Sequence, residues 1–309
     1  MDNVFKWKVF SISALCCLSS FGLMARPWNY SAYEDGIDQP GRYVVEGESQ
    51  NSLIVQDHFT GLSWEQSNSA GNVFWSSTAA RGSAQSYCSR LRKGNYSDWR
   101  VPSVTELQSL MDYTRINSPM TNQEIFSDQA NPLYWASAAH ANSSGVAWVF
   151  DFKSGASIYV LLKHPDVSVR CVRGESMQLS ERYVDEQNGL IIETTKQIKD
   201  RVTGLVWERT PKRVCNWEMA KQYCHDLALG GYRWHLPSIK ALATLVDYNR
   251  IGPSINRDVF LKTRLDSYWS STSFKSTRFA WSTLFVNGRL DTEMKMGNQP
   301  VRCVRIGDE

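Results

Sequence analysis

The chain has 309 residues, more than one ordinary hydrophobic core holds, so two domains are expected. With 42% hydrophobic and 21% charged residues it has the composition of a folded protein, which excludes extended disorder. The net charge is +3, and the unusual feature of the composition is its 12 tryptophans.

Residues 1–25 have the pattern of a secretory signal peptide. Lys6 and Lys8 precede an apolar stretch over 9–23, and the small residue Ala25 suits cleavage. A membrane anchor is the alternative, but serines and a glycine interrupt the apolar run, whereas a membrane span needs about 20 strongly apolar residues. We expect signal cleavage and export to the periplasm, cell surface or medium, with no later membrane-spanning segment and a linker over 26–41.

Short motifs then recur in the same order along the two halves of the chain: RYV, TGL.WE, YC..L, W..PS, DY.RI, YW.S and VRCVR. The first series begins at Arg42 and the second at Arg182. Such self-similarity predicts two copies of one domain. We place them at 42–173 and 182–305, joined by a linker over 174–181.

The duplication also predicts the disulfides. Two of the seven cysteines lie in the signal peptide, and an exported protein forms disulfides by default. Cys88 corresponds to Cys224, and Cys171 corresponds to Cys303. If both copies fold alike, the pairs are Cys88 with Cys171 and Cys224 with Cys303, each closing a loop worth about 4 to 5 kcal/mol.

Within each copy, helical patterns come before strand patterns. Apolar residues have helical spacing over 84–91 and again over 220–227. In the first copy, Ser103 and Glu106 form a capping box, which predicts the start of a second helix. The second copy keeps the serine as Ser238 but lacks the glutamate. Short aromatic and β-branched segments follow and predict strands. Each copy is therefore expected to be an α+β domain with two helices, a small antiparallel sheet and one disulfide.

The motif series resembles the C-terminal domain family of the Lcl collagen-like adhesins, and both copies carry it. That family resembles the C-type lectin-like fold, so the resemblance implies two tandem C-type-lectin-like domains whose chain ends pair in one sheet, with irregular loops available for ligands. It also implies a role in attachment to glycosaminoglycans and other sulfated polysaccharides. The W..PS segment is also similar to a segment of formylglycine-generating enzymes, which makes an enzyme-related domain an alternative.

Tryptophans stack on sugar rings, but they also fill cores. Eight of them recur in register, which favours core packing: Trp64, Trp99, Trp135, Trp148, Trp207, Trp234, Trp269 and Trp281. Trp28 and Trp75 are the better candidates for exposed ligand contacts, although Trp75 is also a candidate for the first-copy equivalent of Trp217.

The two copies differ in net charge. The segment 42–173 has 11 basic and 11 acidic residues, whereas 182–305 has 20 basic and 12 acidic residues. A sulfated or anionic glycan can pair with several cations at once, although a solvated surface without a partner is the alternative. The candidate ligand-binding cations of the second copy lie mainly in predicted loops or on its first helix: Lys212, Arg213, Lys221, Lys262, Arg264, Lys275, Arg278 and Arg289. By contrast, we expect Arg170, Arg173, Arg302 and Arg305, which recur beside the cysteines, to pair with Asp98, Asp112 or Asp247.

The sequence gives little support for a catalytic or metal-binding site. The tripeptides of calcium lectins are absent, and none of the five histidines recurs at an equivalent position. Cys215 has no counterpart. It is either a buried apolar thiol or the site of an intermolecular disulfide that makes a dimer, and a nucleophile pair with His225 or His235 is the weaker enzymatic alternative.

No Gly-rich phosphate loop occurs, so a nucleotide site is not expected. We also expect no other cofactor, no metal and no nucleic-acid partner. The sequence predicts an exported, non-enzymatic binding protein for a polysaccharide or another anionic glycan at the bacterial cell surface. A structural protein–protein module of an envelope assembly is a further alternative.

Overall fold

The computed structural model describes residues 40–47, 52–68, 73–115, 117, 119–126, 131–176, 181–211, 213–275 and 277–307. The predicted signal peptide, nearly all of the predicted linker over 26–41, part of the linker over 174–181 and the candidate residue Lys212 lie outside these ranges. Within them, no helix has both the length and the apolar character that a membrane crossing requires.

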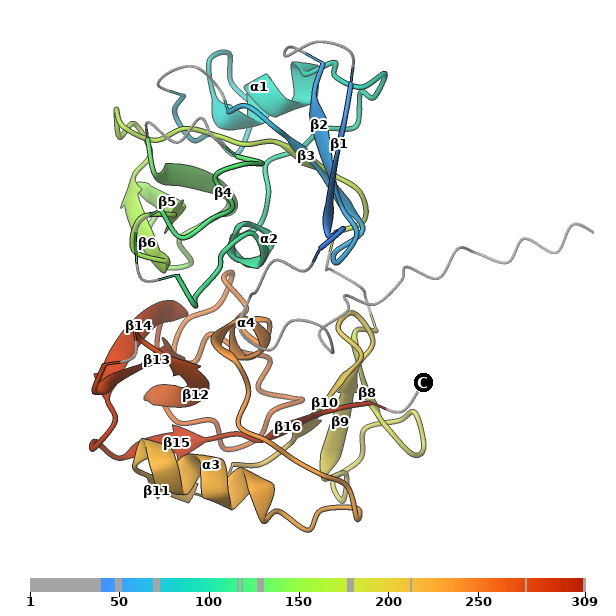
Figure 1. Ribbon diagram of the computed structural model, residues 1–309, viewed down its shortest axis with the longest axis vertical. Helices are drawn as coiled ribbons and strands as arrows, with labels where there is room; N and C mark the ends of the chain where they lie inside the picture. The colour runs from blue at the N-terminus through green and yellow to red at the C-terminus, as the bar shows by residue number, and fades with distance from the viewer. Residues whose placement is uncertain are drawn as a thin grey trace, which may run out of the picture.

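Two similar α+β units follow one another along the chain (Figure 1). Each has an antiparallel four-stranded sheet in which the strand near its C-terminal end pairs with a strand near its beginning. In the first unit the order is β1 (Tyr43–Glu46), β2 (Ile54–Asp57), β3 (Leu62–Glu65), β7 (Val172–Arg173). In the second unit the order is β16 (Val304–Ile306), β10 (Leu205–Glu208), β9 (Gln197–Asp200), β8 (Tyr183–Asp185).

Each unit also has a three-stranded antiparallel meander. The meanders consist of β4 (Leu133–Ala139), β5 (Val146–Asp151) and β6 (Ala156–Leu161) in the first unit, and β12 (Ser267–Ser273), β13 (Phe279–Leu284) and β14 (Arg289–Met294) in the second. A short pair, β11 (Arg213–Cys215) with β15 (Gln299–Val301), is described in the second unit. The architecture is mixed α+β with mostly antiparallel sheets, which confirms the predicted class.

The predicted helices are present, and their N-termini are capped. They are α1 (Ala84–Arg90), α2 (Val104–Ser109), α3 (Trp217–His225) and α4 (Ile239–Ala243). The side chain of Ser103 accepts from the backbone of Glu106, whose carboxylate accepts from the backbone of Ser103, so the predicted capping box is confirmed. Ser238 caps α4 by accepting from the Ala241 amide, without the reciprocal bond.

Both predicted disulfides are present. Cys88 is bonded to Cys171 with a Cα–Cα distance of 5.5 Å, and Cys224 is bonded to Cys303 with a distance of 5.4 Å. Each joins the first helix of its unit to the residue just before the terminal strand. The two bonds close loops of 83 and 79 residues. In the chain-entropy model each stabilises its unit by about 4 to 5 kcal/mol.

All eight tryptophans that recur in register are buried, which confirms their prediction as core residues. The arginine prediction is confirmed only for Arg173, whose Nε lies 2.8 Å from the Asp98 carboxylate. Asp112 and Asp247 instead pair with the neighbouring Arg115 and Arg250. The other three recurrent arginines reach different acceptors: Arg170 and Arg302 bond to backbone carbonyls, and Arg305 pairs with Glu186.

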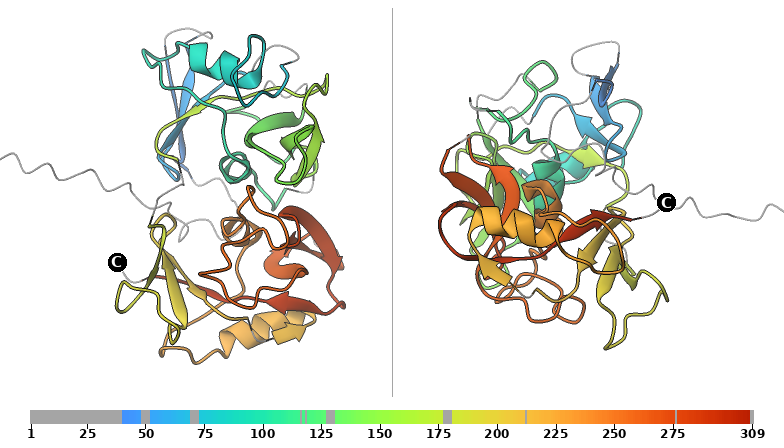
Figure 2. Two further views of the ribbon diagram at one scale, coloured as in Figure 1. Left: turned by 180° about the vertical axis from the view of Figure 1, so that it is seen from behind. Right: turned by 60° about the horizontal axis from the view of Figure 1, so that its bottom comes forward.

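The two units share one hydrophobic cluster across a seam where α2 and α4 meet (Figures 1 and 2). The seam is nearly symmetric. The ring of Tyr113 contacts Trp281 of the other unit edge-on at 5.1 Å, and the equivalent Tyr248 contacts Trp148 edge-on at 5.0 Å. The two repeats therefore pack on each other as the halves of a symmetric dimer do, although they belong to one chain.

Polar contacts also cross the seam. The buried Lys240 at the start of α4 donates from Nζ to the carbonyl of Ser109 at the end of α2, at 3.1 Å. The backbone amide of Leu290 donates to Oγ of Ser157, at 3.2 Å. Because these two buried hydrogen bonds join the units in addition to the shared hydrophobic cluster, the seam resembles a domain interior more than a contact between independent domains.

Candidate functional site on the second repeat

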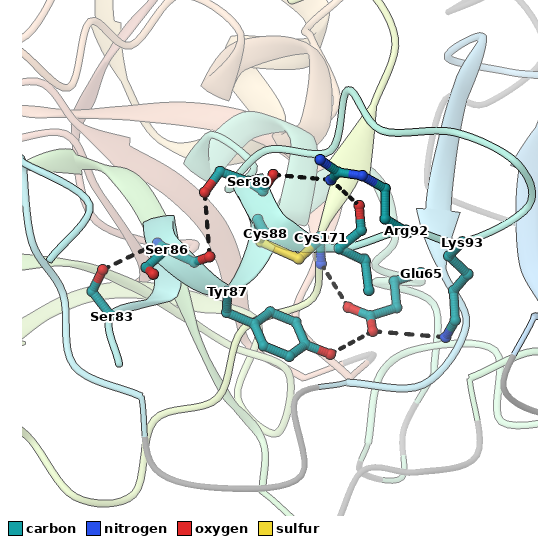
Figure 3. The surroundings of a disulfide bond; sticks show 10 residues. Glu65, Ser83, Ser86, Tyr87, Cys88, Ser89, Arg92, Lys93 and Cys171 are labelled. Carbon is teal, nitrogen blue, oxygen red and sulfur yellow. Dashed lines mark hydrogen bonds and ion pairs between the residues drawn. A yellow bond between two sulfur atoms is a disulfide. The ribbon is translucent and has the colours of Figure 1, made fainter. Parts of the chain in front are cut away.

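Beside each disulfide lies a buried glutamate that the sequence analysis did not single out, and Figure 3 shows the one beside Cys88 and Cys171. Glu65 accepts from the Tyr87 hydroxyl at 2.7 Å and from the Cys171 amide at 3.3 Å, and Lys93 Nζ lies 3.7 Å away. Burial, the largest influence, raises the pKa of Glu65 above its ordinary value. The glutamate ties the first helix to the terminal strand, and its recurrence in the TGL.WE motif was the available signal.

The second repeat has the same arrangement. Glu208 accepts from the Tyr223 hydroxyl at 3.0 Å and from the Cys303 amide at 3.3 Å. Burial raises the pKa of Tyr223, so its hydroxyl remains a proton donor to Glu208. Because the glutamate is buried in both repeats and bonded to the framework, we interpret this pair as part of the fold rather than as a reactive site.

One predicted cation, Lys221, lies over the same ring as Lys295, which the sequence analysis missed, and the turn with the predicted Lys275 and Arg278 adjoins Lys295. The ring of Trp217 has Lys221 Nζ at 3.9 Å and Lys295 Nζ at 4.2 Å from its centroid. Lys295 also donates from Nζ to Oγ of Ser273 at 2.8 Å and from its amide to the carbonyl of Arg278 at 2.9 Å. We call the set Lys221, Lys275, Arg278 and Lys295 the lysine face.

The lysine face is assembled from three separate segments of the chain. Lys221 comes from α3, Lys275 and Arg278 from the turn between β12 and β13, and Lys295 from the turn after β14. Lys221 pairs with Glu218 at 2.8 Å, but both side chains are well exposed. Such a pair contributes only about 0 to 1 kcal/mol, so an incoming polyanion can displace the glutamate.

The remaining predicted cations lie elsewhere on the second repeat. Arg264 pairs with Asp266 at 3.0 Å in the loop that also holds the exposed Lys262. Arg289 begins β14 beside the seam and has the Asp291 carboxylate at 3.9 Å. The exposed Arg213 lies in β11 and lines a hollow beside α3. The predicted cations therefore do not form one patch.

Trp75 is not the exposed contact that the sequence suggested, and that prediction is wrong. It is only 7% exposed, and its Nε1 donates to the carbonyl of Ala136 at 2.8 Å. Trp217 is also 7% exposed and donates to the equivalent carbonyl of Ser270 at 2.7 Å. The two tryptophans are thus equivalent framework residues. Trp28 lies outside the described residues.

Cys215 is a buried apolar thiol, 3% exposed. Its carbonyl accepts from Nε1 of Trp269 at 2.9 Å, as the carbonyl of Val73 accepts from Trp135 at 2.7 Å, so Cys215 stands where the first repeat has a valine. Burial raises the pKa of the thiol, which disfavours the reactive thiolate. The prediction of a dimer through Cys215 is wrong for this structure, because a second chain cannot reach the sulfur.

Within the described ranges, no group of three or more His, Cys, Asp or Glu side chains is arranged to hold a metal ion.

The model of the Lcl C-terminal domain family matches residues 53–173 and 196–305. The chain belongs to this family. The two Lcl C-terminal domains correspond to the two repeats, which confirms the resemblance found in the sequence. A comparison with curated proteins finds no match.

The two Lcl C-terminal domains differ at the lysine face. The amide of Lys295 bonds to the carbonyl of Arg278, and the equivalent bond in the first domain joins Leu162 to Gly145. Counting from the paired cysteines, Gln85 replaces Lys221, and counting from the YW.S motif, Ala141 replaces Lys275. All four positions are therefore uncharged in the first domain, and the lysine face is a property of the second domain alone.

Proposed function

We propose that this protein is an exported, non-catalytic binding protein whose second Lcl C-terminal domain binds an anionic polysaccharide at the bacterial surface. The observation that carries the proposal is the lysine face, where Lys221 and Lys295 lie over the ring of Trp217 and the turn that holds Lys275 and Arg278 is hydrogen-bonded to Lys295. Clustered cations attract a polyanion more strongly than the same charges scattered over a surface. The two disulfides suit an oxidising, extracytoplasmic compartment.

We further propose that each domain has a C-type-lectin-like fold. Three features support this: the pairing of the terminal strand with an early strand of the same domain, the disulfide from the first helix to that terminal region, and the long loops between α2 and the meander. On such a scaffold, loops and the exposed side of a helix provide the ligand contacts, and the residues of the lysine face come from these same elements.

Heparin chromatography of the oxidised mature chain tests the proposed function. The variant Lys221→Gln, Lys275→Ala, Lys295→Leu introduces the residues that the first domain has at these positions. We expect wild-type protein to be retained at low ionic strength, and the variant to elute at clearly lower salt, because it has lost three charges from one face.

A matched control removes three exposed cations of the first domain through Arg81→Gln, Lys153→Ala and Lys163→Leu. The net charge of the control equals that of the variant, so it reports the effect of total charge. Its elution is expected to stay near that of wild type. Absence of wild-type retention, or equal elution of the variant and the control, would refute the proposal.

A further inference from the structure

The second domain has a hollow of about 360 Å³ beside α3. Its lining includes Arg213, Met219, Gln222, Tyr223, Asp226 and Leu227. Four of these residues, at positions 219, 222, 223 and 226, have the spacing of one helical stripe, and Lys221 lies on a different side of the same helix. The volume is within the range of small-ligand sites.

The polar groups of the hollow have defined positions. Nε2 of Gln222 lies 2.8 Å from each carboxylate oxygen of Asp226, one helical turn away, and so orients the carboxylate. Arg213 lines the hollow from β11 and is exposed. A guanidinium binds a carboxylate or sulfate through two parallel hydrogen bonds, and an oriented carboxylate accepts hydrogen bonds from hydroxyls.

Apolar groups make up much of the remaining lining. Met219 is 46% exposed, and Leu227 adds a second aliphatic side chain. The hydroxyl of Tyr223 donates to the buried Glu208, so the ring is the part of Tyr223 that is available to a ligand in the hollow. A pyranose unit has an apolar C–H face and a rim of hydroxyls, which matches an aromatic and thioether surface next to a carboxylate.

The first domain lacks this set of polar groups. Counting from the paired cysteines, it has Arg90 in place of Asp226 and the buried Ser86 in place of Gln222, while the tyrosine is retained as Tyr87. This set of polar groups, like the lysine face, is therefore specific to the second domain.

We propose that this hollow binds one acidic sugar unit of the polysaccharide, with Arg213 pairing with its carboxylate or sulfate, Asp226 accepting from adjacent hydroxyls, and Met219 and Tyr223 contacting the ring. This inference rests on the proposed function and names the subsite that gives it selectivity. A helix with its side chains is about 10–12 Å across, so a bound chain of a few sugars that crosses α3 reaches Lys221 on the lysine face.

Methyl NMR of the full chain, labelled with ¹³C at the methionine methyl groups, provides a local test. Met219 reports the hollow, whereas Met294 and Met296 lie beside Lys295 and report the lysine face. The Met219 signal is assigned with Met219→Leu. A heparin-derived tetrasaccharide is expected to shift the Met219 signal saturably, whereas the neutral chitin tetrasaccharide leaves it in place.

Asp226→Asn separates the inference from simple charge attraction. It removes a negative charge, so attraction alone predicts tighter binding of the heparin tetrasaccharide. The hollow predicts weaker binding by about tenfold, as does Arg213→Gln, because each loses hydrogen bonds made with a charged group. Arg257→Gln and Asp258→Asn change exposed residues outside the hollow and are expected to leave the affinity unchanged.

A stationary Met219 signal, or tighter binding by Asp226→Asn, would overturn the inference. If wild-type protein is still retained on heparin through the lysine face, the proposed function survives that result and the subsite alone is wrong. If the protein is not retained and no methionine signal shifts, both are wrong. If the heparin tetrasaccharide shifts the Met219 signal of wild type and Asp226→Asn weakens its binding, the proposed subsite is supported whether or not the protein is retained on the heparin column.

Discussion

Replacing Trp281 with leucine tests whether the two repeats form one cooperative unit. Trp281 is buried in the second repeat, and its ring lies 5.1 Å from Tyr113 of the first repeat and 5.5 Å from Phe274. Truncating a buried tryptophan to alanine costs about 3 to 5 kcal/mol, and leucine restores part of the lost volume. Adding the lost aromatic pair, worth about 1 kcal/mol, we expect a net loss near 3 kcal/mol.

The assay is urea unfolding followed by hydrogen exchange and mass spectrometry, which gives a separate curve for peptides of each repeat. We expect both curves to move to lower urea together, and the melting temperature to fall by roughly 6 to 12 °C. The mirror-image variant Trp148→Leu should act in the same way, because its ring contacts Tyr248 across the seam at 5.0 Å.

A double-mutant cycle measures the contact across the seam itself. Tyr113→Leu combined with Trp281→Leu is expected to show a coupling of about 1 kcal/mol, whereas Tyr113→Leu combined with Trp234→Leu, a buried residue of a different cluster, should be additive. The reasoning is refuted if Trp281→Leu leaves the curve of the first repeat unmoved, or if the Tyr113 and Trp281 changes are additive.

Three further predictions concern single positions. Burial raises the pKa of Glu65 in the folded chain above 4.5. The folded chain therefore binds this proton more tightly than the unfolded chain does. Protonation stabilises the fold below the unfolded pKa, and this stabilisation is lost as pH rises through the folded pKa. The unfolding free energy of wild type minus that of Glu65→Gln should therefore fall as pH rises above the ordinary pKa of a glutamate, and a pH-independent difference would contradict this. Gly288 has a φ of +82°, and an added Cβ would lie 2.7 Å from the Val246 side chain, whereas Gly189, with a φ of +75°, has open space. Gly288→Ala should thus lower the urea midpoint more than Gly189→Ala, whose cost is only about 1 to 2 kcal/mol of backbone strain, and equal losses would argue against tight packing between Gly288 and Val246. Finally, Cys215 should react with a thiol reagent in denaturant but not in the folded chain, and rapid reaction of the native protein would show that the thiol is accessible.

Duplication made much of the fold predictable from the sequence. Comparing the repeats assigned both disulfides, located the helices and their serine caps, and identified the eight framework tryptophans as core residues. Each of these depends on residues that occupy equivalent positions within one domain, and two aligned copies in one chain display such positions directly.

The contacts between the repeats were not predictable in this way. Tyr113 and Tyr248 recur in the DY.RI motif, but a recurring aromatic residue does not indicate whether its partner lies in its own repeat or in the other one. The candidate site had a similar difficulty. Net charge pointed to the second repeat, which holds the lysine face. It did not distinguish that face from Arg264 and Arg289, which have nearby carboxylates, and the sequence analysis did not include Lys295, which lies in a turn between two methionines.

Trp75 shows a second limit of the sequence. Because residues are inserted between Trp75 and Cys88, the sequence left two interpretations open, a framework equivalent of Trp217 and an exposed ligand contact. The hydrogen bond from its indole to the carbonyl of Ala136 places it in the framework. The hollow beside α3 was not predicted, because it forms only where β11 lies next to one stripe of the helix.

The most direct test of the proposed binding function is to map where a bound polyanion lies. A heparin tetrasaccharide with a photoreactive group is crosslinked to the oxidised mature chain, and the attached peptides are identified by mass spectrometry. Crosslinks concentrated on α3, the turn between β12 and β13, and the turn after β14 are the predicted result. Crosslinks concentrated on the first repeat, or spread evenly over both repeats, would contradict the account.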